Sequence, residues 1–500
     1  MNRAFCNTCG ALVRARRDVR DGRVYLAKDC PTCGCTETMI STQAERFEAK
    51  QAFDPPQPEK ACHLDCLDCN HGRKPGLVFL DLTNRCNLNC PICINNTPSM
   101  GYLFDPPFEY FERIFKDLST FDPKPSIQLF GGEPTVRQDL FEIIACARSY
   151  GLATRLVTNG VRLADEAYCR EVIRSKATIL LSYDGANPET YRRLRGRADI
   201  LEKKVQALDH IARIGGAKVT LMSMSAKGFN DHEFPEMLRF CHDRRQCIRA
   251  IYLMPLAETW DEADFDLKTE RTTMEDVEAM VAKAFTEDPI EFLPAGLLGQ
   301  VSNLLAALKV KPPPFQGAHP NCESMSMLIS DGEAYRPMGH YLKSPLGAVV
   351  RDVLAVDARL GAARPAAGRS AGRLARGLWR LRGLGMTVGL VRRHAHLGRL
   401  LRGRGLGRLW HALALPLGFL CGRRSRAVFA AHTRVGRTLQ LVVLPFEDRS
   451  TLETARLKRC PTAFAYFDPE EDRVHYVPTC AWNLHKDAAM RRIVAHYAQG

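Results

Sequence analysis

Short apolar runs alternate along the middle of this chain with longer segments in which apolar residues recur every three or four positions. The short runs predict strands at 77–83, 126–130, 153–157, 178–183, 217–223 and 249–254. The periodic segments predict helices near 108–118, 138–150, 164–175, 199–214 and 233–244. Repeated strand–helix order predicts a parallel sheet with crossover helices. Six such units make three quarters of an eight-fold barrel, whose ligand-binding residues lie at the C-terminal strand ends.

The C-terminal part has a different pattern. An apolar strand follows residue 322 and ends in the turn 330–332, and the segment between residues 460 and 480 predicts a hairpin. The 500 residues are enough for two to four domains. Hydrophobic content of 45% and charged content of 25% are ordinary for a globular chain.

The net charge of +14 is concentrated in one segment. Residues 351–440 contain nineteen Arg, no Lys, two Asp and no Glu, which gives +17 and leaves −3 for the rest of the chain. Basic character is therefore a property of this segment alone.

The 19 cysteines cluster in short spacings rather than spreading as a disulfide framework would. The sequence shows no secretory signal, so we expect metal ligation in a reducing compartment and a cytoplasmic location. Cys146, Cys169, Cys241, Cys247 and Cys421 lie in helical or apolar stretches, which is typical of buried thiols.

The most informative cysteines are Cys86, Cys90 and Cys93, spaced by three and then two residues after the first predicted strand. Three thiolates can hold three irons of a four-iron cluster and leave the fourth iron open, whereas ordinary ferredoxin clusters use four cysteines. A zinc knuckle or structural thiols are the alternative. The spacing resembles the signature of radical S-adenosylmethionine (SAM) enzymes, which implies a [4Fe-4S] cluster that binds SAM and yields a 5′-deoxyadenosyl radical.

Later motifs resemble the same superfamily in the same order. Gly131-Gly132-Glu133-Pro134 follows the second strand; its glycines let the backbone approach a ligand, and the resemblance implies that this segment binds the methionine amino group. The resemblance also implies SAM contacts for further residues at or near strand ends. These are Ile92, Asn159, Ser182, Ser223 and Met254, and ordinary packing is the alternative for Ser223 and Met254.

Cys6, Cys9, Cys30 and Cys33 form two Cys-x2-Cys knuckles with the spacing of a zinc ribbon or a rubredoxin. Four thiolates suit either iron or zinc, so the pattern predicts a metal without identifying it. Free surface thiols are the alternative, and Cys35 is a spare.

A second three-then-two spacing, Cys62, Cys66 and Cys69, precedes the first and is followed by His71. It predicts an auxiliary [4Fe-4S] cluster, with a zinc site that includes His71 as the alternative. Three scattered cysteines in polar surroundings are further candidate ligands, enough for one or two auxiliary clusters in all. They are Cys322, Cys460 and Cys480.

Together, the knuckle pair, the element at 62–71, the radical SAM motifs and the terminal Cys460 … Cys480-Ala-Trp-Asn segment resemble the tetraether lipid synthase family, some relatives of which are labelled pterin methylases. The resemblance spans roughly residues 1–335 and 455–486. It implies a substrate with unactivated hydrocarbon carbons. The chain departs from the family in the 62–71 element and in a long insertion.

That insertion predicts a basic amphipathic helix, because Arg369, Arg373, Arg376 and Arg380 recur on one helical face beside leucines. The later apolar run 409–421 is shorter than the ~20 residues that span a bilayer. Basic helices with short apolar runs lie at membrane interfaces and favour anionic lipid. A nucleic-acid patch and a disordered low-complexity insertion are the alternatives.

Four arginines after the fourth strand, at 192, 193, 195 and 197, form either a solvated face or an anion contact. The expected organisation is a metal-binding domain (1–50), an auxiliary cluster element (51–75), a partial (β/α)6 radical SAM core (76–310), an auxiliary-cluster region (311–345 and 446–500) and a membrane-interface insertion (346–445).

The expected activity is hydrogen abstraction from an sp³ carbon of a lipid tail, followed by carbon–carbon coupling between chains. The expected partners are a lipid, the inner face of the membrane and a ferredoxin- or flavodoxin-type electron donor, without nucleic acid. The first alternative is a radical methylase of a pterin or another heterocycle, and the second is a peptide-modifying enzyme with auxiliary clusters. A metal-stabilised nucleic-acid binder is the distant third.

Overall fold

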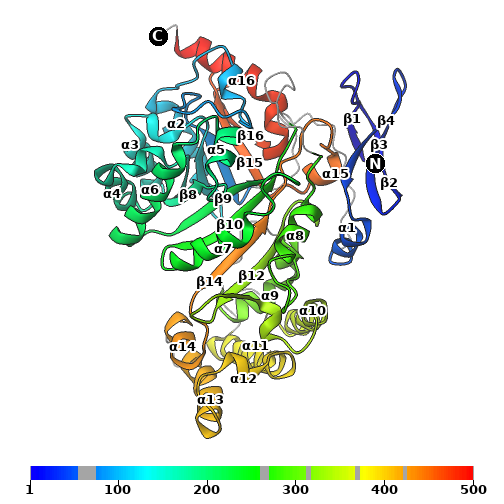
Figure 1. Cartoon of the computed structure of the whole chain (residues 1–500), viewed down its shortest axis with the longest axis vertical. Coiled ribbons are helices and arrows are strands. Elements are labelled where there is room, and N and C mark those ends of the chain that lie inside the picture. Colours follow the sequence, from blue (N-terminus) through cyan, green and yellow to red (C-terminus); the bar gives the residue numbers. More distant parts are fainter. Residues whose placement is uncertain are drawn as a thin grey trace.

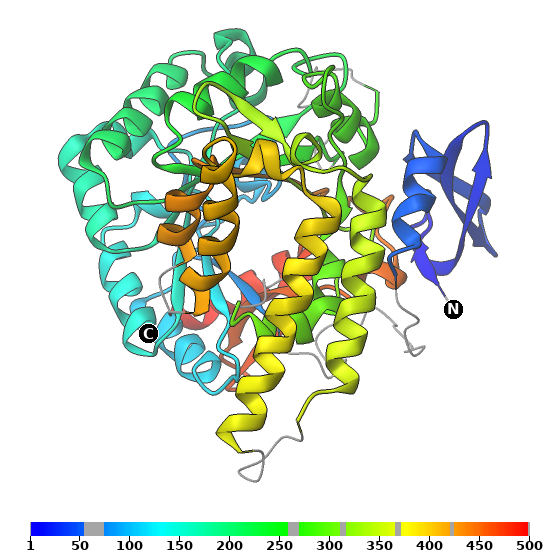
Figure 2. The same cartoon turned by 90° about the horizontal axis from the view of Figure 1, so that it is seen from below.

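The computed structural model describes residues 2–54, 75–258, 270–310, 317–365, 372–420 and 425–498. These residues form a four-stranded antiparallel sheet near the N-terminus and a twelve-stranded sheet that organises most of the remaining chain. Figure 1 shows the small sheet at the side of the larger unit, and Figure 2 shows the larger sheet and its helices as an open ring.

Six neighbouring parallel strands follow one another in chain order. They are β5 (Leu77–Asp81), β6 (Ser126–Phe130), β7 (Ala153–Thr158), β8 (Thr178–Ser182), β9 (Val219–Ser225) and β10 (Ile248–Pro255). Crossover helices lie between them: α2 (Phe108–Leu118), α3 (Leu140–Ser149), α4 (Glu166–Arg174), α5 (Pro188–Arg195), α6 (Ile200–Ile214) and α7 (Phe234–Asp243). The predicted partial barrel is confirmed; α5, which carries three of the four arginines, was not predicted.

Every residue of β5 is buried, as expected for a parallel strand covered on both faces. The α2 helix turns Tyr110, Phe111, Ile114, Phe115 and Leu118 into the same large hydrophobic core. Burial of these faces, more than helix propensity, holds the crossover helices on the sheet.

Two strands from the C-terminal region extend the parallel array at its opposite edges. β14 (Thr438–Val443) pairs in parallel with β10, and β15 (Thr462–Asp468) pairs in parallel with β5. β15 and β16 (Arg473–Pro478) form the predicted hairpin, but the parallel pairing of β15 was not predicted. Beyond β14 lie the antiparallel strands β12 (Ser324–Ser330), β11 (Leu293–Pro294) and β13 (Tyr335–Pro337). The connection 444–461 therefore joins the two ends of an eight-stranded parallel array.

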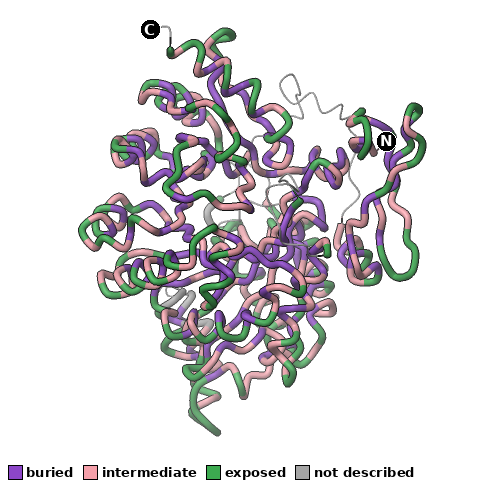
Figure 3. The backbone as a smooth tube through the Cα atoms, turned by 45° about the horizontal axis from the view of Figure 1, so that its top comes forward, coloured by how far each residue is buried: buried purple, intermediate pink, exposed green. Residues whose placement is uncertain are grey.

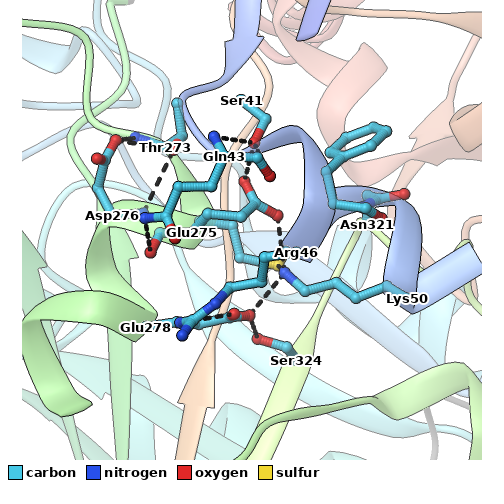
Figure 4. Close-up of polar contacts among 12 residues, drawn as sticks. Ser41, Gln43, Arg46, Lys50, Thr273, Glu275, Asp276, Glu278, Asn321 and Ser324 are labelled. Atoms are coloured by element: carbon cyan, nitrogen blue, oxygen red, sulfur yellow. Dashed lines mark hydrogen bonds and ion pairs between the residues drawn. The ribbon is translucent and has the colours of Figure 1, made fainter. Parts of the chain in front are cut away.

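The small sheet comprises β1 (Arg3–Phe5), β2 (Leu12–Arg20), β3 (Arg23–Cys30) and β4 (Gly34–Ser41), followed by α1 (Ala44–Gln51). Helix α1 docks on α8 (Met274–Ala282) through a buried charge cluster. Lys50 Nζ lies 2.8 Å from a Glu275 oxygen and 2.6 Å from a Glu278 oxygen, and Figure 4 shows Lys50 reaching both carboxylates.

The basic insertion is helical over its described residues and extends from one end of the molecule (Figure 1). Its helices are α10 (Leu346–Ala362), α11 (Arg373–His394), α12 (Leu397–Leu400), α13 (Leu406–Leu420) and α14 (Ser425–His432). Arg369 lies outside the described residues, so the expected row of four arginines is visible only from Arg373 onward. The described part of the insertion is therefore helical, which contradicts the alternative of a disordered insertion for these residues. None of the described helices is long and apolar enough to cross a membrane.

The remaining helices connect these parts: α9 (Ser302–Ala307), α15 (Thr454–Leu457) and the C-terminal α16 (Trp482–Tyr497). Figure 3 marks buried residues through the strands at the centre and many exposed residues along the helices of the insertion.

Candidate active site

One cavity of about 230 Å³ joins most of the residues singled out by sequence. Cys86, Cys90 and Cys93 line it from the loop after β5, and Gly131, Gly132, Glu133, Asn159 and Ser182 line it from the ends of β6, β7 and β8. Cys322, Cys460 and Cys480 line the same cavity from the C-terminal region. The structure therefore brings two separate groups of cysteines to one cavity.

Local hydrogen bonds shape the loop of Cys86, Cys90 and Cys93. The Cys93 amide donates to the Cys90 carbonyl, and the Leu88 amide donates to Cys86 Sγ over 3.4 Å. Burial raises the pKa of the Cys90 thiol, so iron binding there must displace a proton. Three sulfurs on one short loop match the donor set expected for a cluster with one open iron.

Gly131 and Gly132 pack closely against the backbone of the loop that carries Cys86, Cys90 and Cys93. A Cβ on Gly131 would lie 2.4 Å from the Thr83 carbonyl oxygen, and one on Gly132 would lie 2.2 Å from the Arg85 carbonyl oxygen. The Gly132 amide also donates to the Thr83 carbonyl over 2.7 Å. Any side chain here would push the loop that carries Cys86 away from β6. The sequence-based explanation, close approach to a ligand, omitted this packing role.

The Glu133 side chain is a brace between strand ends. Its carboxylate is buried and accepts hydrogen bonds from Thr135 (amide and hydroxyl), from the Thr158 hydroxyl and from the Asn159 amide. Three of these donors reach Oε1 and one reaches Oε2, so the side chain links the ends of β6 and β7.

Ser182 is held by a buried lysine that sequence reasoning missed. Lys204 Nζ donates to Ser182 Oγ over 2.6 Å, to the Ser182 carbonyl over 2.8 Å and to the Asn159 carbonyl over 2.6 Å. Burial, followed by nearby Arg195, lowers the pKa of Lys204 to about 8. Its position on the inner face of α6 was the available signal, since lysine is almost never fully buried without partners.

The arginine run divides in two. Arg192 and Arg197 are exposed and pair with Glu189 and Asp199, which confirms the solvated-face interpretation for them. Arg195 instead lines the cavity and forms two 2.8 Å contacts with the buried Asp184. A fixed cation thus lies in the wall of the site.

The strand-end prediction is wrong for Ser223. Strand β9 continues to Ser225, and its alternation places Met222 and Met224 in the cavity wall while Ser223 lies on the opposite face. Met254 and Ile92 do line the cavity. Pro134 is buried in the turn after Glu133 but does not line the cavity.

A buried network ties the C-terminal helix to the cluster loop. Asp81, at the end of β5, accepts hydrogen bonds from Trp482 Nε1 over 2.7 Å and from Asn95 Nδ2 over 3.0 Å. Lys486 Nζ donates to the Asn95 carbonyl. Trp482 and Lys486 belong to α16, two and six residues after Cys480, so the cysteine and the loop share one rigid support.

Charged groups surround the C-terminal cysteines. Arg456 Nε lies 3.4 Å from Cys322 Sγ, and an Arg456 amine lies 2.7 Å from a Glu447 oxygen. Burial raises the pKa of the Cys480 thiol well above its usual range. The cysteines at 62, 66 and 69, and His71, lie outside the described residues.

The four N-terminal cysteines meet at one point. The sulfurs of Cys6, Cys9, Cys30 and Cys33 all lie within 4.8 Å of one another, and Cys9 Sγ and Cys30 Sγ are 3.7 Å apart. Zinc–sulfur bonds of 2.3 Å in a tetrahedron require sulfurs about 3.8 Å apart. The geometry fits a single metal ion, and the spare Cys35 is exposed.

Sequence reasoning also missed three polar groups of the cavity wall. Gln128 of β6, Tyr252 of β10 and Glu323, just before β12, line the cavity. Arg155 of β7 donates to Tyr252 Oη over 3.3 Å. Alternation along β6 and β10 would have placed Gln128 and Tyr252 inside the barrel, but no local motif marked them.

Comparison with known proteins agrees with this geometry. Residues 80–241 match the radical SAM superfamily model, and residues 2–42 match the HMPTM N-terminal zinc ribbon domain model. The cofactors that follow are a [4Fe-4S] cluster with SAM at the barrel, and a metal ion at the four-cysteine site.

Individual relatives are similar over part of their length. The 7,8-dihydro-6-hydroxymethylpterin dimethyltransferase of Methanocaldococcus jannaschii is 29% identical over 344 residues, 66% of this chain and 67% of that one. The GTP 3′,8-cyclase of Rhizobium etli is 29% identical over 234 residues, 45% of this chain and 64% of that one. SuiB of Streptococcus suis bound to S-adenosylmethionine is a similar solved structure, with 15% identity, coverage of 56% and 68%, and a TM-score of 0.36.

The similarity to a pterin dimethyltransferase favours the methylase alternative over the lipid-coupling expectation. A cysteine loop after β5, the glycine pair that supports it, and a matching superfamily model over residues 80–241 all concern the same cavity. The chain is a radical SAM enzyme that carries an N-terminal zinc ribbon.

Proposed function

We propose that the enzyme methylates a small nitrogen heterocycle of the pterin type. The observation that carries this proposal is the single cavity into which both the SAM-site residues and the C-terminal cysteines open. The pterin and GTP named for the two relatives share an aminopyrimidinone ring. The chain spans about two thirds of the length of these relatives. The activity of the whole protein is therefore part of what we propose.

In this proposal, Cys86, Cys90 and Cys93 hold the cluster, which together with SAM supplies the 5′-deoxyadenosyl radical. Backbone atoms of 131–133 orient the methionine part, and Asn159 and Ser182 lie where its polar groups would bind. Ile92 and Met254 offer apolar surface to the adenine. Methionine and aromatic side chains of the barrel interior would shield the radical from reductants in solution that could quench it.

A second part of the proposal concerns Cys322, Cys460 and Cys480, which we assign as ligands of an auxiliary cluster. Their common cavity supports this assignment. The adjacent Arg456 cation would stabilise the negative charge of thiolate-bound iron, as positive groups do for thiolates. We also propose Cys62, Cys66 and Cys69 as cluster ligands and a small ferredoxin- or flavodoxin-type electron donor.

Anaerobic reconstitution tests the function directly. In the proposed reaction a second SAM donates each methyl group and leaves as S-adenosylhomocysteine, and the reductant supplies the further electron. Protein supplied with SAM, a reductant and 6-hydroxymethyl-7,8-dihydropterin should therefore form 5′-deoxyadenosine, S-adenosylhomocysteine and a pterin heavier by one or two methyl groups, measured by mass spectrometry. The Cys90→Ala variant should form neither 5′-deoxyadenosine nor the methylated pterin. Deoxyadenosine without any alkylated pterin, across a panel of pterins, would contradict the methylase assignment and leave the radical chemistry standing.

Coupling of lipid tails at the inner face of a membrane is a second candidate, favoured by the surface of the insertion. Leu374, Leu378, Leu409 and Trp410 are more than half exposed on α11 and α13. Between residues 372 and 420 the chain has ten Arg and no Asp or Glu. Exposed apolar groups among arginines fit an anionic membrane interface.

Vesicle binding tests this second candidate. A variant with Leu374, Leu378 and Trp410 changed to Ser should lose binding to anionic phospholipid vesicles and remain folded, because these side chains are exposed. Lipid extracts of a host expressing the wild-type chain should then contain tails of doubled length. Vesicle binding that is equal in both proteins would eliminate the membrane-interface role. Point substitutions are required because removal of 345–440 would cut into β14, which begins at Thr438.

A further inference from the structure

The cavity contains hydrogen-bond acceptors that the protein leaves without matching donors. Gln128 is 4% exposed, and no donor among the described residues reaches its Oε1. Glu323 is 3% exposed, and its carboxyl group has no hydrogen bond or ion pair within the described residues, although the charge of nearby Arg155 acts on it. Both side chains line the cavity that contains the SAM-site residues.

Such groups are costly unless a ligand satisfies them. An unsatisfied buried acceptor destabilises the folded state by about 1–3 kcal/mol, and more when it is charged, so proteins normally pair these groups. Elsewhere in this chain buried carboxylates are paired: Glu133 accepts four hydrogen bonds, and Asp184 binds Arg195. Gln128 and Glu323 differ from these because they line the cavity without such partners among the described residues.

The rest of the cavity wall is mainly apolar. Phe79, Phe130, Val157, Met222 and Leu444 contribute hydrocarbon surface around the polar groups. Ligand sites of this kind use apolar walls for affinity and a few placed polar groups for orientation and specificity. Aromatic rings and methionine side chains offer good contact surface for a flat ring.

We propose that Glu323 and Gln128 recognise the N–H groups of a flat nitrogen heterocycle, with Glu323 accepting from an amino-substituted ring edge and Gln128 Oε1 from a second N–H. This inference rests on the proposed function and specifies the substrate class of that site. Gln128 and Glu323 come from strands far apart in the sheet, β6 and the start of β12, so they contact different edges of the ring. Tyr252, which accepts a hydrogen bond from Arg155, adds a hydroxyl group to the polar surface.

A hydrocarbon tail is a poor ligand for these two residues. It carries no N–H donor, so it would displace water from both acceptors and leave them unpaired in a desolvated cavity. The polar groups therefore favour the heterocycle over the lipid as the occupant of the space beside the SAM site.

Binding measurements without turnover test the inference. The probes are 6-hydroxymethyl-7,8-dihydropterin and its analogue with a 2-oxo group in place of the 2-amino group. The proteins are wild type, Glu323→Gln, Gln128→Met and the control Glu48→Gln, which makes the same chemical change on the exposed side of α1. Deoxyadenosine formation from SAM without substrate reports whether each SAM site is intact.

The wild type should bind the 2-amino probe at least tenfold more tightly than the 2-oxo analogue. Glu323→Gln should weaken binding of the 2-amino probe about 10-fold, the upper part of the range for one net hydrogen bond. The same variant should also show a smaller difference in affinity between the 2-amino and 2-oxo probes, because the new amide can donate a hydrogen bond to the 2-oxo group. Gln128→Met should weaken both probes, and Glu48→Gln should match wild type. A smaller difference in affinity between the two probes indicates lost recognition, whereas damage to the fold would weaken binding of both probes equally.

Two results would overturn the inference in different ways. If wild type binds and methylates the dihydropterin while Glu323→Gln and Gln128→Met bind it equally well, the recognition site is wrong and the proposed function stands. If wild type binds neither probe, the proposed pterin function fails, and the assignment of these two residues fails with it.

Discussion

Single buried side chains decide how the C-terminal region meets the barrel. Trp482 is 2% exposed, and its indole N–H reaches Asp81, the last residue of β5. Asp81 is itself buried, and burial raises the pKa of its carboxyl group. The aromatic residue after Cys480 is thus a polar anchor as well as a packing group, which its sequence pattern alone did not reveal.

Replacement of Trp482 by Phe should keep most of the packing and remove the donor to Asp81. We expect the free energy of unfolding to fall by about 1–3 kcal/mol, the cost of a buried acceptor left unsatisfied, measured by denaturant titration. Trp410→Phe is the matched control, because Trp410 is 64% exposed and should change stability by less than about 0.5 kcal/mol. Equal stability of the two variants would show that the Asp81 contact contributes nothing.

His242 should make stability sensitive to mild acid. It is buried, hydrogen-bonded to Ser330 Oγ over 2.9 Å, and packed edge-on against Tyr335. Burial lowers its pKa, with nearby Arg245 acting in the same direction. The unfolded chain therefore binds this proton near pH 6.5 and the folded chain only at lower pH. The contribution of His242 to the free energy of unfolding is therefore fully present above pH 6.5 and is lost as the pH falls below this value.

The measurement is the unfolding free energy between pH 5 and 8. His242→Gln should show a shallower loss below pH 6.5 than wild type, whereas His496→Gln, at an exposed position of α16, should retain the wild-type slope. Identical slopes in all three proteins would refute a contribution from His242.

At the scale of elements, a helix pair adds to the contacts that attach the zinc ribbon to the large unit. Lys50 of α1 is 4% exposed and lies between Glu275 and Glu278 of α8, which are 1% and 2% exposed. Ser41 donates a hydrogen bond to the second oxygen of Glu275, and Ser324 donates to the Glu278 oxygen that Lys50 also reaches (Figure 4). Arg46 lies 3.6 Å from the other Glu278 oxygen. Such a cluster tolerates loss of all its charges better than loss of one.

Lys50→Met should destabilise the attachment by about 3–5 kcal/mol, because it leaves the buried Glu275 without a cation and Glu278 with only the more distant Arg46. Unfolding titrations and limited proteolysis between the ribbon and the barrel measure the effect. The triple variant Lys50→Met, Glu275→Gln, Glu278→Gln should recover most of the loss. If the triple variant is no more stable than the single one, charge compensation is the wrong explanation.

At the scale of the whole molecule, the ribbon and the barrel have separate metal-binding sites. Cys6, Cys9, Cys30 and Cys33 use only residues of the small sheet, while the cavity cysteines belong to the large unit. A chain built in this way should lose one metal without losing the others.

Cys9→Ser should remove one metal ion per chain, measured by elemental analysis, and leave the iron and sulfide of the barrel unchanged. Because metal binding contributes to the folding free energy of such a site, we expect the small sheet to become sensitive to protease in this variant. Cys35→Ser, the exposed neighbour, should retain the full metal content. Loss of barrel iron in Cys9→Ser but not in Cys35→Ser would show that the two centres depend on each other.

Local sequence patterns were sufficient for the repeated units of the barrel. The strands β5 to β10 lie within a few residues of their predicted positions, because each is a short apolar run bounded by polar residues. The cysteine spacings and Gly131-Gly132-Glu133 were equally visible, since residues close in sequence form them. The positions of these groups in one cavity followed from the rule that parallel strands end at the same edge.

Tertiary structure alone decided which distant segments meet. The pairing of β15 with β5 joins residues nearly four hundred positions apart, and no local periodicity encodes such a partner. The same holds for Lys204 against Ser182, and for Glu323 and Gln128 in one cavity. Ser223 was expected at the site because it was expected to end the strand, but β9 continues to Ser225 and its alternation places Met222 and Met224 in the cavity wall instead. By itself the sequence determined the chemistry of the radical SAM site, and the fold decided what surrounds it, because burial and pairing depend on the whole chain.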